Sequence, residues 1–129
     1  MLKEAIILGL VGMMIELTFT SIIESWKRRD LALMGRVSLW MFPVYALGLS
    51  YGFDFVMSVI PSDPYRWLSY PLWIWAVEIL VGLPAQRAGI EIWNYGDHFQ
   101  WHWRGLVCWS FAPIWIAFGI IVEMAKGWI

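Results

Sequence analysis

Two carboxylic acids, Glu16 and Glu78, stand within long apolar stretches of the sequence. An ionised carboxylate at the middle of a bilayer costs about 2.5–3.5 kcal/mol, so each side chain must face protein or water. Two uses fit this requirement. The acids form a proton-linked or headgroup-binding site, or they are buried carboxyls, protonated or paired with Arg36 or Arg104, that hold helices in register.

Polar and aromatic side chains alternate in the segment from Pro84 to Gly105. Such a segment does not span a membrane, but it suits the headgroup layer or the mouth of a helix bundle. Three of its side chains are candidates to engage a headgroup or solute together with the acids: Trp93, Tyr95 and Arg104.

His98 and His102 lie four residues apart, so a metal site is arithmetically possible. The glutamate of an H-E-x-x-H motif is absent, and we therefore expect interfacial histidines, no metal and no other cofactor. Phosphate-binding glycine loops, G-x-S-x-G and C-x-x-C are absent as well, which favours a protein without catalytic residues. A membrane enzyme using Glu78 with one of these histidines as an acid–base pair is a further alternative.

The composition of the 129-residue chain is that of an integral membrane protein. It is 60% hydrophobic and 15% charged, against about 45–50% and about 25% in soluble domains. One cysteine excludes an intrachain disulfide, and a net charge of −1 gives no basis for nucleic-acid binding. The length fits one polytopic domain over residues 1–129.

Four apolar stretches are long enough to be membrane helices, and they predict an all-α four-helix bundle. Their approximate bounds are 5–26, 38–60, 67–83 and 106–123. Glu4 in the charged start and the lack of an A-x-A site favour a mature first helix over a signal peptide. We expect Pro71 in the first turn of a short third helix, Pro84 at its end, and a kink at Pro113 in the fourth.

Small and polar residues indicate where these helices pack. Gly12, Glu16, Thr20 and Glu24 recur every four residues, which predicts a contact surface or a cavity wall on the first helix. Glycines at 48, 52 and 82 predict close packing of the second and third helices. We expect Gly48 and Gly52 to form an internal packing face rather than a dimer site. Gly82 lies one turn after Glu78. The acids near helix ends are expected to be solvated: Glu4, Asp54 and Glu123.

The distribution of Lys and Arg predicts the orientation. Six such residues fall on the side of the first and third loops and three, including Arg66, on the side of the termini. This places the two loops in the cytoplasm and both termini opposite, in a bacterial inner membrane. The tryptophans near the predicted helix ends form the aromatic belt of such a protein.

Several sequence blocks resemble one known family in the same order along the chain. They are the 12–16 segment, Leu39–Ala46 with its Pro43 and Tyr45, Glu78–Gly82 as E-x-x-x-G, and Trp93-Asn94-Tyr95 followed by Phe99, Gly105 and Ser110–Trp115. This pattern is similar to the ABC-transporter type IV (CmpB-like) family of small four-helix membrane proteins, whose members are similar to vertebrate transmembrane protein 229. The resemblance implies the four-helix fold and, through the family label only, a link to transport. Asn94 stands where that family has an aspartate.

Two functions are compatible with these features. The first is a small polytopic scaffold or accessory subunit, without catalytic activity, that packs against lipid and a larger membrane-protein partner. The second is an oligomeric lipid- or small-solute-binding or transport protein that uses Glu16 and Glu78. Small size, missing reaction motifs and many aromatic side chains favour the first.

Overall fold

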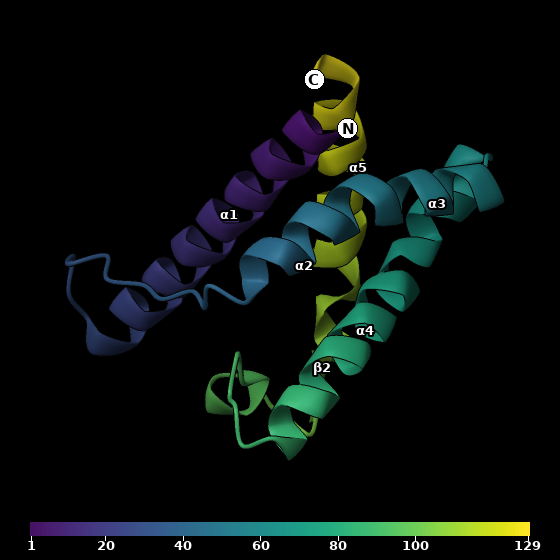
Figure 1. The fold of residues 1–129 in the computed structure, drawn as a ribbon. Helices are drawn as coiled ribbons and strands as arrows, with labels where there is room; N and C mark the ends of the chain where they lie inside the picture. The colour runs from purple at the N-terminus through teal and green to yellow at the C-terminus, as the bar shows by residue number, and fades with distance from the viewer. The chain divides into compact units, whose positions relative to one another are not determined.

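The computed structural model describes residues 1–129 and is mostly helical (Figure 1). Four of its helical stretches are long and apolar enough to cross a membrane. The prediction of four such stretches is confirmed, and their bounds are Leu2–Arg28, Met41–Val59, Asp63–Arg87 and Trp109–Trp128. The chain divides into two compact units, Met1–Tyr51 and Gly52–Ile129, each of which is described by itself.

Glycines bring α1 (Leu2–Arg28) close to α2 (Met41–Leu47) in the first unit (Figure 1). A Cβ at Gly9 would lie 2.8 Å from the Phe42 ring, and one at Gly12 would overlap Tyr45. The absence of side chains at these two positions therefore allows aromatic rings of α2 to lie on the backbone of α1. The predicted packing role of Gly12 is confirmed.

The connection between α1 and α2 runs back beside the last two turns of α1. The helix ends at Arg28 and is followed by Arg29, whose φ of 55° lies in the left-handed region. The Leu33 N–H donates to Ser25 Oγ at 3.0 Å. Further back, Thr20 Oγ1 donates to the Arg36 carbonyl and accepts from the Arg36 N–H, both at 3.0 Å. Side chains of α1 thus hold the backbone of the connection.

The second apolar stretch is interrupted by a π-helix, Gly48–Gly52, between α2 and α3 (Phe53–Val59). The division between the two units falls in this π-helical segment. The prediction of close packing at Gly48 is wrong, because a Cβ there would meet nothing within 4 Å. The two glycines instead bound a widened helical turn, in which Ser50 Oγ donates to the Ala46 carbonyl.

In the second unit, α4 (Asp63–Arg87) and α5 (Ala112–Trp128) form an antiparallel pair. Gly119 faces the ring of Tyr70, which is itself 1% exposed and stacked on Phe53 with ring centres 4.7 Å apart. Val122 of α5 is buried near the Tyr70 end of this pair. Toward the other end of α4, the core is continued by these buried residues of the segment before α5: Leu106, Val107, Cys108 and Phe111.

The prolines of the third and fourth helices are placed differently from the prediction. The first turn of α4 contains Pro64, so Pro71 is internal, and the helix continues past Pro84 to Arg87. The third helix is therefore 25 residues long rather than short. Pro113 does not kink α5, because it lies in the first turn, where a missing N–H removes no helical hydrogen bond.

A β-hairpin within the segment before α5 is the one departure from the all-α prediction. Strands β1 (His102–Trp103) and β2 (Val107–Cys108) pair antiparallel. Arg104 and Gly105 occupy the turn with φ of 53° and 71°, and Leu106 N–H donates to the Trp103 carbonyl at 2.9 Å. Two consecutive positive φ values are what a type I′ hairpin turn requires.

Candidate functional site

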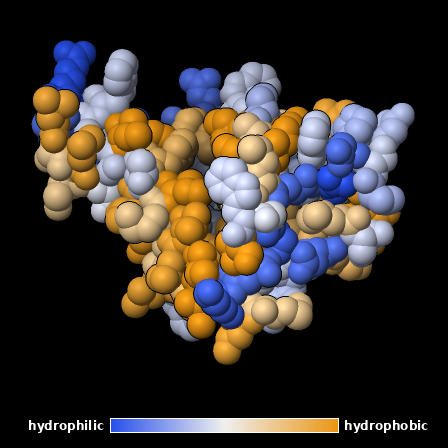
Figure 2. Space-filling view, turned by 90° about the horizontal axis from the view of Figure 1, so that it is seen from above, coloured by the Kyte–Doolittle hydropathy of each residue, from blue (hydrophilic) through white to orange (hydrophobic).

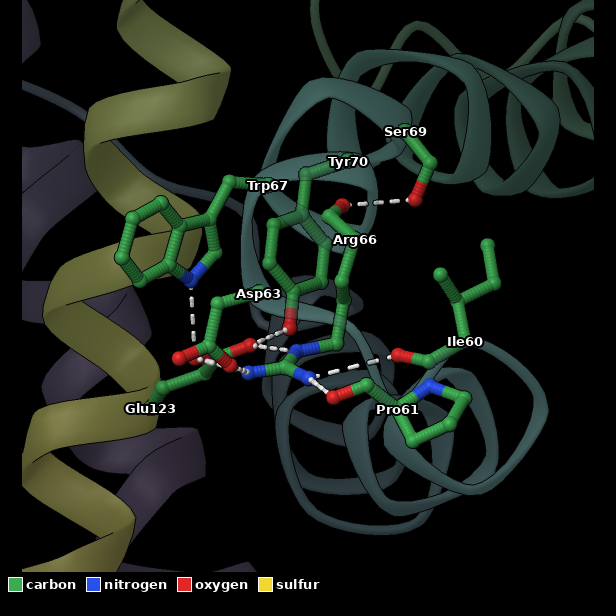
Figure 3. A network of polar contacts seen from close by, with 8 residues as sticks. All are labelled: Ile60, Pro61, Asp63, Arg66, Trp67, Ser69, Tyr70 and Glu123. Carbon is green, nitrogen blue, oxygen red and sulfur yellow. Dashed lines mark hydrogen bonds and ion pairs between the residues drawn. The ribbon is translucent and has the colours of Figure 1, made fainter.

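Glu123 of α5 is the centre of a hydrogen-bond network with residues of the first two turns of α4 (Figure 3). Its Oε1 accepts from Arg66 Nε and from the Tyr70 hydroxyl. Its Oε2 accepts from Arg66 Nη2 and from Trp67 Nε1, both at 3.0 Å. Because a carboxylate offers about four lone-pair positions, these four bonds fill its capacity.

The guanidinium of Arg66 is equally saturated. Its donors that do not reach Glu123 are directed to the turn before α4: Nη1 donates to the carbonyls of Ile60 (3.2 Å) and Pro61 (2.9 Å), and Nη2 donates to Asp63. With the two bonds to Glu123, all five N–H groups are used. Carbonyls at the end of α3 have no helical donor, and Arg66 supplies one.

This network, defined by Arg66, Trp67, Tyr70 and Glu123 and called the Glu123 network from here on, corrects two sequence predictions. Glu123 is not solvated, since its side chain is 12% exposed and that of Arg66 is 8% exposed. Nor does Arg66 lie in a loop, because it belongs to the beginning of α4 and is ion-paired with Asp63 and Glu123. This geometry suits a structural contact that holds α4 and α5 together. Because every lone pair of the Glu123 carboxylate already accepts a hydrogen bond, the carboxylate has no position left for a substrate.

A second ion pair lies in the same unit. Lys126 Nζ, close to the end of α5, lies 3.1 Å from Asp54 Oδ1 in the first turn of α3. The Asp54 side chain is 49% exposed, as expected for a solvated acid, but it is also ion-paired, which was not expected.

The predicted site residues of the third helix and the aromatic segment are brought together. The Tyr95 hydroxyl donates to Glu78 Oε1 at 2.8 Å. One turn further along α4, a Cβ at Gly82 would lie 3.1 Å from the ring of Trp93, whose Nε1 donates to the Leu106 carbonyl at 2.9 Å. Gly82 thus packs closely as predicted, and Glu78 is partnered by a tyrosine.

A half-open groove of about 230 Å³ lies beside this contact, at the end of α4. Its polar lining comes from Gln86, Glu91 and Asn94. Gln86 Nε2 already donates to the Arg104 carbonyl at 2.9 Å, and Asn94 Oδ1 accepts from the Gly96 N–H at 2.8 Å. Two of the three polar side chains are therefore already engaged in holding the loop.

The predicted polar stripe of α1 is a contact surface, and all of its members face the chain that follows α1. Gly12 packs on Tyr45, and the Tyr45 hydroxyl donates to Glu16 Oε2 at 2.7 Å. Glu24 Oε1 lies 3.1 Å from Arg36 Nε. Of the alternatives left open for Glu16, the pair with Arg36 is not formed: Arg36 instead meets Glu24, two turns further along the helix.

The remaining candidates have structural partners in the loop. Arg104 lies over the Trp103 ring, 5.4 Å from its centre, and the alternative in which it pairs with Glu78 is replaced by the Tyr95 contact. His102 Nδ1 accepts from the Gly105 N–H at 2.9 Å, inside the hairpin. His98 packs edge-on against Phe99, and no group of three potential metal ligands is formed.

The Glu123 network does not follow from the predicted helix bounds, because Arg66 lies just outside the third stretch at 67–83. A usable signal was present: Arg66, Trp67 and Tyr70 are spaced i, i+1 and i+4, so three donors share one helical face just after a proline at a helix start. An acid near the end of the following apolar helix is the natural acceptor when the two helices are antiparallel.

Comparison of the chain with protein-family models, curated proteins and solved structures gives no match.

Proposed function

We propose that this chain is a small polytopic membrane scaffold or accessory subunit of a larger membrane complex, without catalytic activity of its own. The observation that carries the proposal is the use of the acids in its apolar helices. Glu16, Glu78 and Glu123 each accept hydrogen bonds from side chains of their own unit. A carboxyl engaged in this way acts as polar glue between segments.

The exposed helix faces support an external partner or lipid. Between 17% and 28% of the residues in each apolar span are buried, so most of each helix must be covered by something else. Exposed apolar side chains follow one another at helical spacing, as on α1 with Ile6, Leu10, Met14 and Ile22. Figure 2 shows hydrophobic residues exposed over much of the face in view. Apolar surface on this scale is typical of contact with lipid or another chain.

The finer expectations belong to the same proposal. They are packing of the four helices into one bundle, a bacterial inner membrane, cytoplasmic first and third loops, and relationship to the ABC-transporter type IV (CmpB-like) family. The count of six cations for the two loops against three for the side of the termini supports that orientation.

Native mass spectrometry of the protein, extracted in native-membrane particles, tests the function. A larger membrane protein bound at fixed stoichiometry is the expected result. A homo-oligomer that carries one defined solute, lost in Glu16→Gln or Glu78→Gln at unchanged folded yield, would overturn the proposal in favour of a transport protein. A monomer that carries only lipid would also overturn it.

A further inference from the structure

The segment 26–40, here called the basic connection, combines positive charge with exposed apolar side chains. Lys27, Arg28 and Arg29 follow one another at the end of α1, and Arg36 lies further along. Two acids lie beside these four cations: Asp30 is 3.6 Å from Arg28, and Glu24 is 3.1 Å from Arg36. The segment with its neighbours therefore keeps a positive balance.

The apolar side chains of the basic connection are directed away from the protein. Leu31 is 92% exposed and Leu39 81% exposed, and these others are exposed as well: Trp26, Leu33, Met34 and Trp40. In Figure 2 hydrophilic and hydrophobic residues stand next to each other at the left end of the view, where Figure 1 places this segment. Basic and apolar groups mixed in this way match the boundary between lipid headgroups and acyl chains.

This exposure is built into the backbone. The Ala32 N–H donates to Asp30 Oδ1 at 3.1 Å, and the Leu33 N–H donates to the buried Ser25 Oγ while Leu33 adopts a φ of 52°. Gly35 fits against α1 so closely that a Cβ would lie 2.7 Å from the Ser21 nitrogen. The connection is thus a fixed structure that presents these side chains outward.

The fold also sets the depth of the basic connection. Irregular backbone exposed to lipid does not occur within the hydrocarbon core, so the part of α1 beside it, from Thr20 to Arg28, must lie in the headgroup layer. Residues 2–19 of α1 then rise about 27 Å at 1.5 Å per residue, close to the hydrocarbon thickness of about 30 Å.

We infer that the basic connection is a binding site for anionic phospholipids, with Arg28 and Arg29 facing the lipid phosphate and Leu39, which lies between Arg36 beside Thr20 and Phe42 beside Gly9, in the upper acyl region. Cations in the last turn also lie favourably at the negative end of the helix dipole. This site depends on membrane insertion of the chain, but it requires no protein partner, so it is independent of the accessory-subunit proposal.

Lipid titration followed by native mass spectrometry tests the selectivity. The delipidated full chain is offered phosphatidylglycerol or phosphatidylcholine, and we expect a clear preference for phosphatidylglycerol. Since each cation near an anionic surface contributes about a fivefold factor, Arg28→Gln/Arg29→Gln should lower that preference about 30-fold. The matched control is Arg87→Gln, an exposed arginine at the end of α4, which should change it less than twofold.

Three outcomes would overturn the inference. They are equal binding of the two lipids, an equal loss in Arg87→Gln, and displacement of phosphatidylglycerol by millimolar glycerol phosphate, which would indicate a site for free anions. Circular dichroism of each variant confirms that the helices are intact.

Depth is tested separately with a bimane label on the exposed position Leu39→Cys in a Cys108→Ala background. Quenching by lipids brominated in the upper acyl chain is expected, and quenching by aqueous iodide alone would place the basic connection in water and overturn the inference. The two proposals can fail separately. If the wild-type chain shows no lipid selectivity but retains a protein partner, this inference fails alone. If the chain is selective but has no protein partner, only the proposed function fails.

Discussion

Arg66 and Glu123 are 57 positions apart in the sequence, yet Glu123 accepts two hydrogen bonds from the guanidinium of Arg66, one on each carboxylate oxygen. This bidentate contact joins the beginning of α4 to the last turns of α5. Trp67 and Tyr70 add two further donors, so the two helix ends are fastened at one point. Bidentate arginine–carboxylate pairs fix geometry as well as contributing energy.

Glu123→Gln should lower the free energy of unfolding in detergent by about 3–5 kcal/mol, because it leaves the buried Arg66 charge without its main counterion. The measurement is chemical unfolding followed by circular dichroism. Glu91→Gln is the control, an exposed acid of the same unit, and should change stability by less than about 1 kcal/mol. Equal effects of the two substitutions would show that the Glu123 network contributes no special stability.

Gly119→Ala should destabilise the second unit by about 1–3 kcal/mol, since the new methyl group would overlap the ring of the fully buried Tyr70. Thermal unfolding in detergent measures the effect. Gly127 lies in the same helix, and a Cβ there meets nothing within 4 Å, so Gly127→Ala should be neutral or slightly stabilising. If both variants unfold at the wild-type temperature, the α4–α5 contact is looser than described.

Gly12→Ala and Gly48→Ala form a matched pair in the first unit. We expect a loss of about 1–3 kcal/mol for Gly12→Ala, which overlaps Tyr45, and no loss for Gly48→Ala, which enters open space. Both are read from the unfolding midpoint of the full chain. A larger loss for Gly48→Ala than for Gly12→Ala would restore the sequence-based view of residues 48–52 as a packing face.

Tyr95→Phe removes the hydroxyl that donates to Glu78 and should lower stability by about 0.6–2 kcal/mol. Glu78→Gln should cost less, because the amide oxygen still accepts this bond. Tyr65→Phe, at a 71% exposed position of the same unit, is the control and should be neutral. If Glu78→Gln proves much more harmful than Tyr95→Phe, the carboxylate has a role beyond this hydrogen bond.

Arg104→Asn should raise stability by up to about 1 kcal/mol, since an Asn-Gly pair suits a type I′ turn better than an arginine at φ 53°. Hydrogen exchange of the hairpin amides and thermal unfolding measure this gain. Arg104→Lys keeps the unfavourable φ and should give no gain. A loss of stability in Arg104→Asn would mean that the contact with Trp103 outweighs the strain of the turn.

The number and type of the long elements could be predicted from the sequence. Apolar stretches of about twenty residues bounded by charges or prolines have few alternatives to membrane helices, and the four such stretches are helical. The four-residue recurrence of Gly12, Glu16, Thr20 and Glu24 also identified the contact face of α1, because helical spacing places these positions on one side whatever packs there.

Helix ends at prolines were predicted less well. Proline ends a helix in isolation, but Pro71 and Pro84 lie inside α4 and Pro113 in the first turn of α5. Whether a proline lies in the first turn of a helix depends on the residue at which that helix begins. The tertiary fold determines this residue, because it determines where the preceding connection ends.

Partners of the polar side chains could be decided only by the tertiary structure. The sequence shows that acids inside apolar helices need polar partners, but Glu16 and Glu78 each accept a hydrogen bond from a tyrosine rather than from an arginine. Glu123 is paired with Arg66, which lies outside the predicted bounds of the third helix. Local composition fixes which residues form helices, since each helix satisfies its own backbone hydrogen bonds. Long-range hydrogen bonds depend instead on how helices are paired and rotated, which no local pattern specifies.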